Sequence, residues 1–408
     1  MPISEVEVNM PSVFIFDSLW SFVIVIGILL LGYTLNNKIL ILEKFNIPPA
    51  ITGGLFAAFV ITLLHFNRIS VSLSVPQQDM LMLMFFSSVG LNANVRKIIE
   101  GGHSILVFLA LSAAFIFLQD GLGITLAKIL GLEPIIGLVA GSITLTGGHG
   151  TAIAWAGVIE KNFGLNVLEL SIASATFGLI VGGIIGGPLA HKRISSLKAK
   201  CFNSCASTVK MPQNSSQTTT SVEILKVLLA LIFCVSSAKL IAQNVVTAEI
   251  SWFRMPVFVY AIFIGIIMTN CLELLPKCKL EKFSLDFVSN LCLSLFLTMA
   301  IVNLKLWHIF DLAIPLLIIL FFQTMLMVIF SYWITFNFMG RNYDAAVILG
   351  GQCGFGLGST PTAVTIMNSI VAHHGPSNRA FLVIPIAGAF FNDLINLVII
   401  ESYLHFLK

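Results

Sequence analysis

Two apolar stretches that are interrupted by glycine and proline decide the fold of this chain. They read TGGHGTAIAWAGVIEKNFG at Thr146–Gly164 and LGSTPTAVTIMNSIVAHHG at Leu357–Gly375. Thr151 aligns with Thr362 at an offset of 211 residues, and the glycines that end the two stretches align at the same offset. Each glycine inside a helix costs roughly 1 kcal/mol relative to alanine. The sequence therefore predicts two related, broken helices in two halves of a chain that repeats itself.

The rest of the chain is strongly apolar. Hydrophobic residues make up 57% of the 408 residues, charged residues make up 10%, and the mean hydropathy is +0.97. Soluble domains carry about 25% charged residues, so a soluble enzyme is excluded. A net charge of +3 without a basic stripe excludes a nucleic-acid binder. Long apolar runs are unlike the alternating segments of a transmembrane β-barrel, which leaves a polytopic helical protein embedded in membrane lipid.

The apolar runs predict an all-α polytopic membrane protein. A spanning helix needs about 20 apolar residues, so there is room for about ten spans plus two re-entrant, Gly-rich hairpins. In the first half we expect the broken stretch Ile135–Ile159 and spans at Phe14–Leu35, Ile47–Phe66, Gln78–Leu91, Ser104–Leu130 and Val167–Leu189. In the second half we expect the broken stretch Tyr343–Ala372 and spans at Val222–Val246, Pro256–Leu275, Leu285–Leu304, Leu312–Phe338 and Phe381–Phe406.

The two halves predict inverted repeats. Each half has five expected spans, and an odd number makes the second copy enter the membrane from the opposite face. We expect an N-terminal repeat at residues 1–190 with its hairpin entering from outside, and a cytoplasmic linker at residues 191–221. A C-terminal repeat then follows at residues 222–408, with its hairpin entering from the cytoplasm.

The loop charges predict the orientation. If each hairpin enters and leaves by one face, 14 of the 22 Lys and Arg residues fall in one set of loops and six in the other, while Lys226 and Lys239 lie inside apolar runs. The richer set is Lys38, Lys44, Arg96, Lys97, Lys192, Arg193, Lys198, Lys200, Lys210, Lys277, Lys279, Lys282, Arg341 and Arg379. Positively charged loops face the cytoplasm, so both termini are expected outside.

Each break predicts a ligand site. Pro361 suits the first position of a new helix, and Thr360 before it is a natural cap. The second half-helix presents unpaired N–H groups and the positive end of its dipole, which suit an anion. The first half-helix and the unwound segment present carbonyl oxygens, which suit a hard cation such as Na⁺. An anionic substrate moving with a cation is the predicted pairing, and glycines that only allow close helix packing are the alternative.

Polar residues at membrane depth complete the candidate substrate site. Asp393 lies in the middle of the last expected span, and a carboxylate there is costly and usually functional. Its candidate roles are to bind a substrate ammonium group, to bind a cation, or to form a hydrogen bond in helix packing. For His149 the roles are donation to the substrate or a structural hydrogen bond. The candidate substrate-binding residues are His149, Gly150, Thr151, Ser359, Thr360, Thr362 and Asp393.

The candidate Na⁺ ligands are oxygen-bearing residues near the breaks and at the ends of matching spans. They are Ser88, Asn92, Thr144, Gly147, Asn303, Gln352, Gly356, Asn392 and Asn396. Asn92 and Asn303 align at the offset of 211 residues, and helix capping is the alternative role for both.

Four motifs resemble the bacterial glutamate:sodium symporter family. They are GGHGTA at Gly147–Ala152, GFGLGSTPTA at Gly354–Ala363, FFND at Phe390–Asp393 and SVGL at Ser88–Leu91. The resemblance runs across nearly the whole chain. It implies an inner-membrane, Na⁺-coupled glutamate carrier with two inverted five-span domains, oppositely entering hairpins, a homodimer and an elevator-like movement. One position departs from the family, because Ser359 stands where members usually carry alanine and adds an oxygen near the predicted site.

The predicted function is sodium-coupled import of glutamate by alternating access. The substrate carboxylates are expected at the two half-helix starts and the ammonium at Asp393. No prosthetic cofactor is expected beside Na⁺ as the coupling ion. The chain contains neither the HExxH of a metalloprotease nor the TVGYG of a channel filter, so neither an enzyme nor a channel is expected. A sodium- or proton-coupled carrier of another small carboxylate is the alternative.

Overall fold

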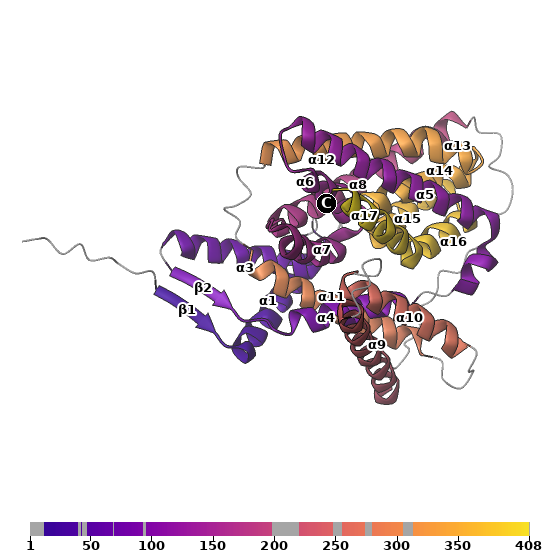
Figure 1. The fold of residues 1–408 in the computed structure, drawn as a ribbon. Coiled ribbons are helices and arrows are strands. Elements are labelled where there is room, and N and C mark those ends of the chain that lie inside the picture. The colour runs from indigo at the N-terminus through magenta and orange to yellow at the C-terminus, as the bar shows by residue number, and fades with distance from the viewer. Residues whose placement is uncertain are drawn as a thin grey trace, which may run out of the picture.

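The computed structural model describes residues 12–39, 42, 47–67, 69–92, 95–197, 220–247, 255–273, 280–304 and 313–407, and helices dominate it (Figure 1). The first half contains α1 (Ser18–Lys38), α3 (Pro49–Phe66), α4 (Gln78–Leu91), α5 (Val95–Ile129), α6 (Pro134–Leu138), the π-helical turn η1 (Val139–Ile143), α7 (Gly148–Phe163) and α8 (Leu168–Ser196). The second half contains α9 (Ser221–Thr247), α10 (Val257–Glu273), α11 (Lys282–Val302), α12 (Ala313–Ile329), η6 (Phe330–Thr335), α13 (Phe336–Phe338), α14 (Tyr343–Gly356), α15 (Thr360–His374), α16 (Asn378–Ile386), η7 (Ala387–Phe391) and α17 (Asn392–Leu407).

Seven helices in the described part of the chain are long and apolar enough to cross a membrane. They are Ser18–Lys38, Pro49–Phe66, Gly102–Ile129, Leu168–Ser196, Ser221–Val245, Lys282–Val302 and Ala313–Phe338. The apolar helices Gln78–Leu91 and Val257–Leu272 are shorter. Pro385 and the π-helical turn η7 divide the last expected span. The prediction of a helical, polytopic membrane protein is confirmed, whereas the count of ten spans stays a prediction.

The N-terminal edge differs from the expectation. β1 (Ser12–Phe16) pairs in parallel with β2 (Ile69–Leu73), and neither strand was predicted from the sequence. Helix α1 begins at Ser18 because Asp17 caps it, with a side-chain oxygen that accepts the Trp20 N–H at 3.1 Å. The apolar run through this boundary hid it, since a short apolar strand and the start of a span look alike without a clear period.

The helices form two bundles, and each bundle takes helices from both halves of the chain (Figure 1). The frame bundle consists of α1, α3, α4, α9, α10 and α11, in which α4 packs on α10 and α11, and α3 packs on α1 and α11. The core bundle consists of α5 to α8 and α12 to α17, in which α8 packs on α14 and α15, and α5 packs on α6, α12 and α17. Contacts of α7 with α11 and of η7 with α4 join the two bundles.

Small residues allow close helix crossings in the frame bundle. A Cβ on Gly90 of α4 would lie 2.2 Å from the Ile262 carbonyl oxygen of α10, so the two backbones touch. A Cβ on Gly54 of α3 would lie 2.8 Å from the side chain of Ile301 in α11. Ile301 follows Gly90 at the offset of 211 residues, so the two crossings use corresponding positions of α4 and α11. Small residues commonly allow such close packing between membrane helices.

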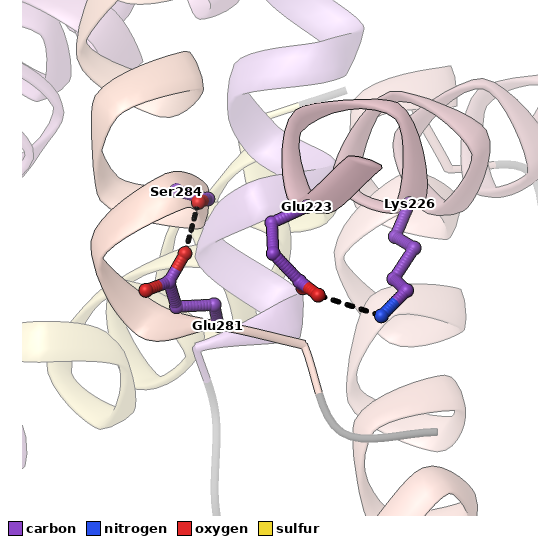
Figure 2. Close-up of polar contacts among 4 residues, drawn as sticks. All are labelled: Glu223, Lys226, Glu281 and Ser284. Carbon is purple, nitrogen blue, oxygen red and sulfur yellow. Dashed lines mark hydrogen bonds and ion pairs between the residues drawn. The ribbon is translucent and has the colours of Figure 1, made fainter. Parts of the chain in front are cut away.

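Polar contacts mark the starts of α9 and α11 (Figure 2). Lys226, which the sequence leaves inside an apolar run, pairs with Glu223 at 2.6 Å and keeps 49% of its side chain exposed. Glu281 directly precedes α11 and accepts a hydrogen bond from Ser284. Both carboxylates lie at a helix start, where the helix dipole favours negative charge.

Candidate functional site

The first broken helix is interrupted at Gly141, inside η1. Gly141 has φ −98° and ψ −131°, so the helical geometry stops there. The carboxylate of Asp120 in α5 replaces the lost helical acceptor: one oxygen accepts the Ser142 backbone N–H and the other accepts the Ser142 hydroxyl, both at 2.8 Å. A Cβ on Gly141 would lie 2.8 Å from Asp120 Oδ1, so a larger residue at this position would displace the carboxylate. Asp120 is fully buried.

A turn with left-handed backbone connects this break to α7. Gly148 has φ 67°, a conformation that glycine adopts without strain, and the Gly147 N–H donates to the Ser142 carbonyl at 2.9 Å. His149 is buried, and its Nε2 lies 3.0 Å from Thr176 Oγ1. The first turn of α7, whose N–H groups have no partner within the helix, contains three predicted substrate residues, His149, Gly150 and Thr151.

The second break ends one residue earlier than the sequence predicted. Ser359, not Thr360, is the N-cap of α15, and its hydroxyl lies 3.0 Å from Thr362 Oγ1. Thr360 belongs to the first turn, and its hydroxyl donates to the Gly388 carbonyl at 3.2 Å. Pro361 is therefore the second residue of α15. The first four N–H groups of a helix have no acceptor within the helix, so the N–H that proline lacks costs no helical hydrogen bond there.

The two breaks meet at the boundary between the bundles. A Cβ on Gly148 would lie 3.4 Å from the Gly358 carbonyl oxygen. On the frame side, a Cβ on Gly150 would lie 3.2 Å from the ring of Phe85 in α4. Thr151 and Ser359 are partly exposed, whereas most of the residues just before the two helix starts are buried. The starts of α7 and α15 therefore lie near each other, next to α4 of the frame bundle, and each has a partly exposed residue.

A small cavity adjoins the two breaks. It offers about 10 Å³ to the centre of a water-sized sphere and is lined by three apolar side chains and by Ser112, Thr146, Gln352, Gly356 and Asn392. Thr146 Oγ1 lies 3.1 Å from the Gly356 carbonyl oxygen and 2.7 Å from Gln119 Oε1. The buried amides of Gln352 and Asn392 have no hydrogen-bond partner among the described residues. The structure thus brings together three predicted Na⁺ ligands, Gln352, Gly356 and Asn392.

Asp393 follows this cavity in α17 and is partly exposed. Within the described ranges, no hydrogen bond or ion pair involves its carboxylate. One turn later, Asn396 Nδ2 donates to the Ser142 carbonyl at 3.2 Å, which ties α17 to the first break. The turn η7, directly before α17, contacts α4 of the frame bundle. Asp393 therefore lies between Asn396, which contacts the first break, and the turn η7, which contacts the frame bundle.

The structure does not bring the other predicted Na⁺ ligands to this cavity. Ser88, Asn92 and Asn303 belong to the frame bundle, where their side chains contact Ser289 (2.6 Å), Asp286 (3.3 Å) and Leu73 (3.4 Å), respectively. Thr144 lies buried in the first broken stretch, and its hydroxyl donates to the Val139 carbonyl at 2.7 Å.

Four polar residues of this region were not predicted from the sequence, namely Ser112, Gln119, Asp120 and Thr146. The signal for Asp120 was available, because it is a carboxylate inside the apolar run Ser104–Leu130 and the rule that selected Asp393 applies to it equally. Ser331 follows Asp120 at the offset of 211 residues. Its hydroxyl lies 3.3 Å from Cys353 Sγ, and Cys353 follows Ser142 at the same offset.

Together these features define a polytopic helical membrane protein in which two broken helices meet beside buried polar groups, with the carboxylate of Asp393 in a neighbouring helix. Residues 14–376 match the family model described as sodium/glutamate symporter. The chain is 38% identical to a sodium/glutamate symporter of Escherichia coli (strain K12) over 395 residues, which cover 95% of this chain and 97% of the relative. It is 39% identical to one of Haemophilus influenzae over 378 residues, 92% of this chain and 94% of the relative.

The chain belongs to the sodium/glutamate symporter family. It is therefore a member of a transporter family and not an enzyme.

Proposed function

We propose that this protein is a sodium-coupled secondary transporter that imports glutamate by alternating access. The observation that carries the proposal is the close approach of the α7 and α15 starts beside α4 of the frame bundle, where Thr151 and Ser359 are partly exposed. Two helix N-termini aimed at one region offer N–H groups and positive dipole ends, which suit a ligand with two carboxylates. The names of the relatives in Escherichia coli and Haemophilus influenzae support glutamate as substrate and Na⁺ as coupling ion.

Each part of glutamate has a proposed partner. The carboxylates bind at the first turns of α7 and α15, where the hydroxyls of Thr151, Ser359 and Thr362 add donors to the backbone N–H groups. The ammonium binds Asp393, whose carboxylate has no other partner in the described part of the chain. The remaining predicted residues contribute to the same two turns through their backbone, namely His149, Gly150 and Thr360.

The proposed architecture is a pair of inverted repeats, residues 1–190 and 222–408, with hairpins that enter from opposite faces. Contacts at corresponding positions support it. Asp120 with Ser142 and Ser331 with Cys353 are contacts in separate halves, and both partners shift by 211 residues. At the frame crossings, Gly90 and Ile301 also differ by 211 residues, and their partners Gly54 and Ile262 differ by 208.

The proposed movement is elevator-like, with the core bundle sliding against the frame bundle. Both breaks belong to the core bundle, so a substrate bound at them would travel with it. The limited contact between the bundles, through α7 on α11 and η7 on α4, supports such sliding. We further propose a homodimer in the bacterial inner membrane, with both termini outside and the linker at residues 191–221 in the cytoplasm.

Uptake into proteoliposomes tests the function directly. We expect an inward Na⁺ gradient to drive accumulation of labelled glutamate by the purified full-length protein. An inward H⁺ gradient in Na⁺-free buffer should not drive it, because the residues near the breaks offer mainly neutral oxygens and few carboxylates. Protein-free liposomes set the background. Full-rate uptake without Na⁺ would contradict sodium coupling, and Na⁺-driven uptake of another substrate but not glutamate would contradict the substrate.

One observation favours a second substrate class. The Ser359 hydroxyl lies at the start of α15 next to Thr362, which adds a donor where a ligand hydroxyl or a further carboxylate oxygen would bind. A small dicarboxylate or hydroxy acid is therefore the alternative substrate. Competition of such acids with labelled glutamate in the same vesicles distinguishes the two, since only a true substrate will itself be accumulated.

A further inference from the structure

Three histidines meet where α8 and α15 end. His191 lies in the last two turns of α8, and His373 and His374 are the last two residues of α15. His191 Nδ1 lies 2.7 Å from His374 Nε2, and the centroids of these two rings are 4.7 Å apart. The centroid of the His373 ring lies 6.1 Å from that of His191. Because α15 has 15 residues, roughly 22 Å of helix separates this cluster from the predicted substrate residues at the start of α15.

A hydrogen bond between two imidazoles limits how much charge the pair can carry. One of the two facing nitrogens must carry a proton and the other must offer a lone pair, so the contact excludes protonation of both rings. Burial lowers the pKa of His374 below the ordinary value near 6.5, and the charges of His191 and His373 lower it further. The contact is therefore intact above this value and is lost as the pH falls below it.

The neighbouring charges of α8 do not compensate for a second proton on the pair. Arg193 donates to the Tyr332 carbonyl at 2.6 Å, and its guanidinium lies 3.7 Å from the Tyr332 ring. Lys192 Nζ lies 5.8 Å from the same ring. The carboxylate of α8, Glu169, belongs to the first turn of this helix, 22 residues before His191. This end of α8 therefore adds only positive charge to the cluster.

The helices α14 and α16 also pack on α15, and their sequences contain one carboxylate, Asp344. Asp344 accepts a hydrogen bond from the Ser377 hydroxyl at 2.6 Å. The Tyr343 hydroxyl of α14 donates to the Gly375 carbonyl, directly after the histidine pair. Arg379 of α16 adds a further cation, which donates to a serine of α5. The carboxylate near this end of α15 is thus already hydrogen-bonded, and the cations around the cluster outnumber it.

We propose that His191 and His374 form a pH switch, which holds the end of α15 against α8 and releases it when both imidazoles are protonated. The release affects ligand binding because the same helix begins next to Ser359, where a substrate carboxylate is proposed to bind. A helix that is free at one end is positioned less well at the other, so acidification lowers the affinity for glutamate. The loop charges place this end in the cytoplasm, so the switch responds to cytoplasmic pH. The effect on glutamate rests on the proposed function, whereas the release of α15 does not.

The first test measures the release of α15 without glutamate. Spin labels are attached to Ser196→Cys in α8 and Ala372→Cys in α15, both exposed positions, in full-length protein with the seven native cysteines replaced by alanine. Electron paramagnetic resonance records the distance between the labels from about pH 8 to about pH 5, on both sides of the ordinary histidine pKa. We expect a single short distance at the upper end of this range and a longer, broader distance that becomes the main component at the lower end.

Two variants and a matched control assign the transition to the pair. His191→Gln and His374→Gln each keep a side chain that can accept a hydrogen bond from the remaining histidine but that cannot be charged. In both variants the short distance should persist to the acid end of the range. His405→Gln is the control, because His405 is an exposed histidine near the end of α17 in the same bundle. Its acid transition should equal that of the wild-type residues.

The second test measures glutamate affinity at saturating Na⁺ in the unlabelled protein. We expect the wild-type affinity to fall by at least roughly fivefold between about pH 7.5 and about pH 5.5, the lower end of the usual coupling between two sites. Both carboxylates of glutamate stay mainly ionised over this range. The fall should be absent in His191→Gln and His374→Gln and unchanged in His405→Gln.

Three outcomes overturn the inference. A label distance that does not depend on pH would show that the pair is not a switch, and an acid transition that persists in both glutamine variants would assign the release to other groups. A release of α15 without a change in glutamate affinity would remove its link to the substrate. In each case Na⁺-driven glutamate uptake by the wild-type protein would leave the proposed function intact. Absence of that uptake is the separate failure of the proposed function.

Discussion

Asp120 and Asp393 both lie in core-bundle helices, but their surroundings differ. Both oxygens of Asp120 accept hydrogen bonds from Ser142, so this carboxylate holds the interrupted backbone of the first break. Asp393 is partly exposed and has no partner within the described ranges. A carboxylate without a protein partner is available to a ligand, whereas one that accepts two good hydrogen bonds has a structural role.

Asp393→Asn should weaken glutamate binding far more than binding of glutarate, which lacks the amine. Losing a charge-assisted hydrogen bond costs about 1.5–3 kcal/mol, which corresponds to at least roughly a tenfold loss of affinity. Competition against labelled glutamate at saturating Na⁺ measures both affinities in one preparation. Equal losses for the two ligands would assign Asp393 to Na⁺ or to packing, and unchanged transport would remove it from the site.

Asp393 could be predicted from the sequence because a carboxylate inside an apolar run is conspicuous by itself. The contact of Asp120 with Ser142 could not, because it depends on the interruption of the helix at Gly141 and on the packing of α5 against it. The same limit applies to the cavity. Gln352 and Asn392 were each selected as oxygen ligands, but their meeting with Ser112 and Thr146 follows from tertiary packing that no local pattern contains.

Glycine has two separate roles in these helices. At Gly148 it allows a left-handed backbone where a new helix begins, and this break was predictable from the cluster of glycines. At Gly90 it allows two helices to touch, and nothing in the sequence identified its partner in α10. The starts of α1 and α15 differ from the predicted starts because the caps at Asp17 and Ser359 are defined by backbone geometry and not by residue type alone.

Gly90→Ala should destabilise the frame bundle by about 1–3 kcal/mol, the usual cost of overpacking a well-packed contact. The added Cβ would lie 2.2 Å from a backbone oxygen of α10, which cannot move aside as a side chain can. Gly27→Ala in α1 is the control, because nothing lies within 4 Å of its added Cβ. Thermal unfolding of the two purified variants measures the difference. A Tm for Gly90→Ala at or above that of Gly27→Ala would contradict the contact.

The grouping of the helices into a frame bundle and a core bundle involves both halves of the chain, and it was not predicted from the sequence. Hydrophobic periods and lengths identify spans one at a time, so they predicted the helices and both breaks in the right order. They do not state which apolar faces pack together, and here the first three helices of one half pack with the first three of the other. Orientation likewise rests on loop charges, many of which lie outside the described residues.

A cysteine introduced at Ser216 should be reachable only from the cytoplasm. The position lies in the linker, outside the described residues, and the bias of 14 basic residues against six puts this linker on the cytoplasmic face. In a background with the seven native cysteines replaced by alanine, an impermeant thiol reagent should label it only after the cells are opened. Lys161→Cys, exposed near the end of α7, should be labelled in intact cells. The reverse pattern would invert the topology.

The interleaving of the two halves has a consequence for biosynthesis. The ribosome completes α1, α3 and α4 long before α10 and α11 emerge, so the early helices wait in the bilayer without their partners. Neither half can finish a bundle alone, and quality-control proteases should remove either half made by itself. Residues 1–209 and 210–408 expressed as two separate chains should therefore accumulate only when both are present, which immunoblots of membranes from singly and doubly expressing cells can measure. Accumulation of either half alone would mean that its helices pack without the other half.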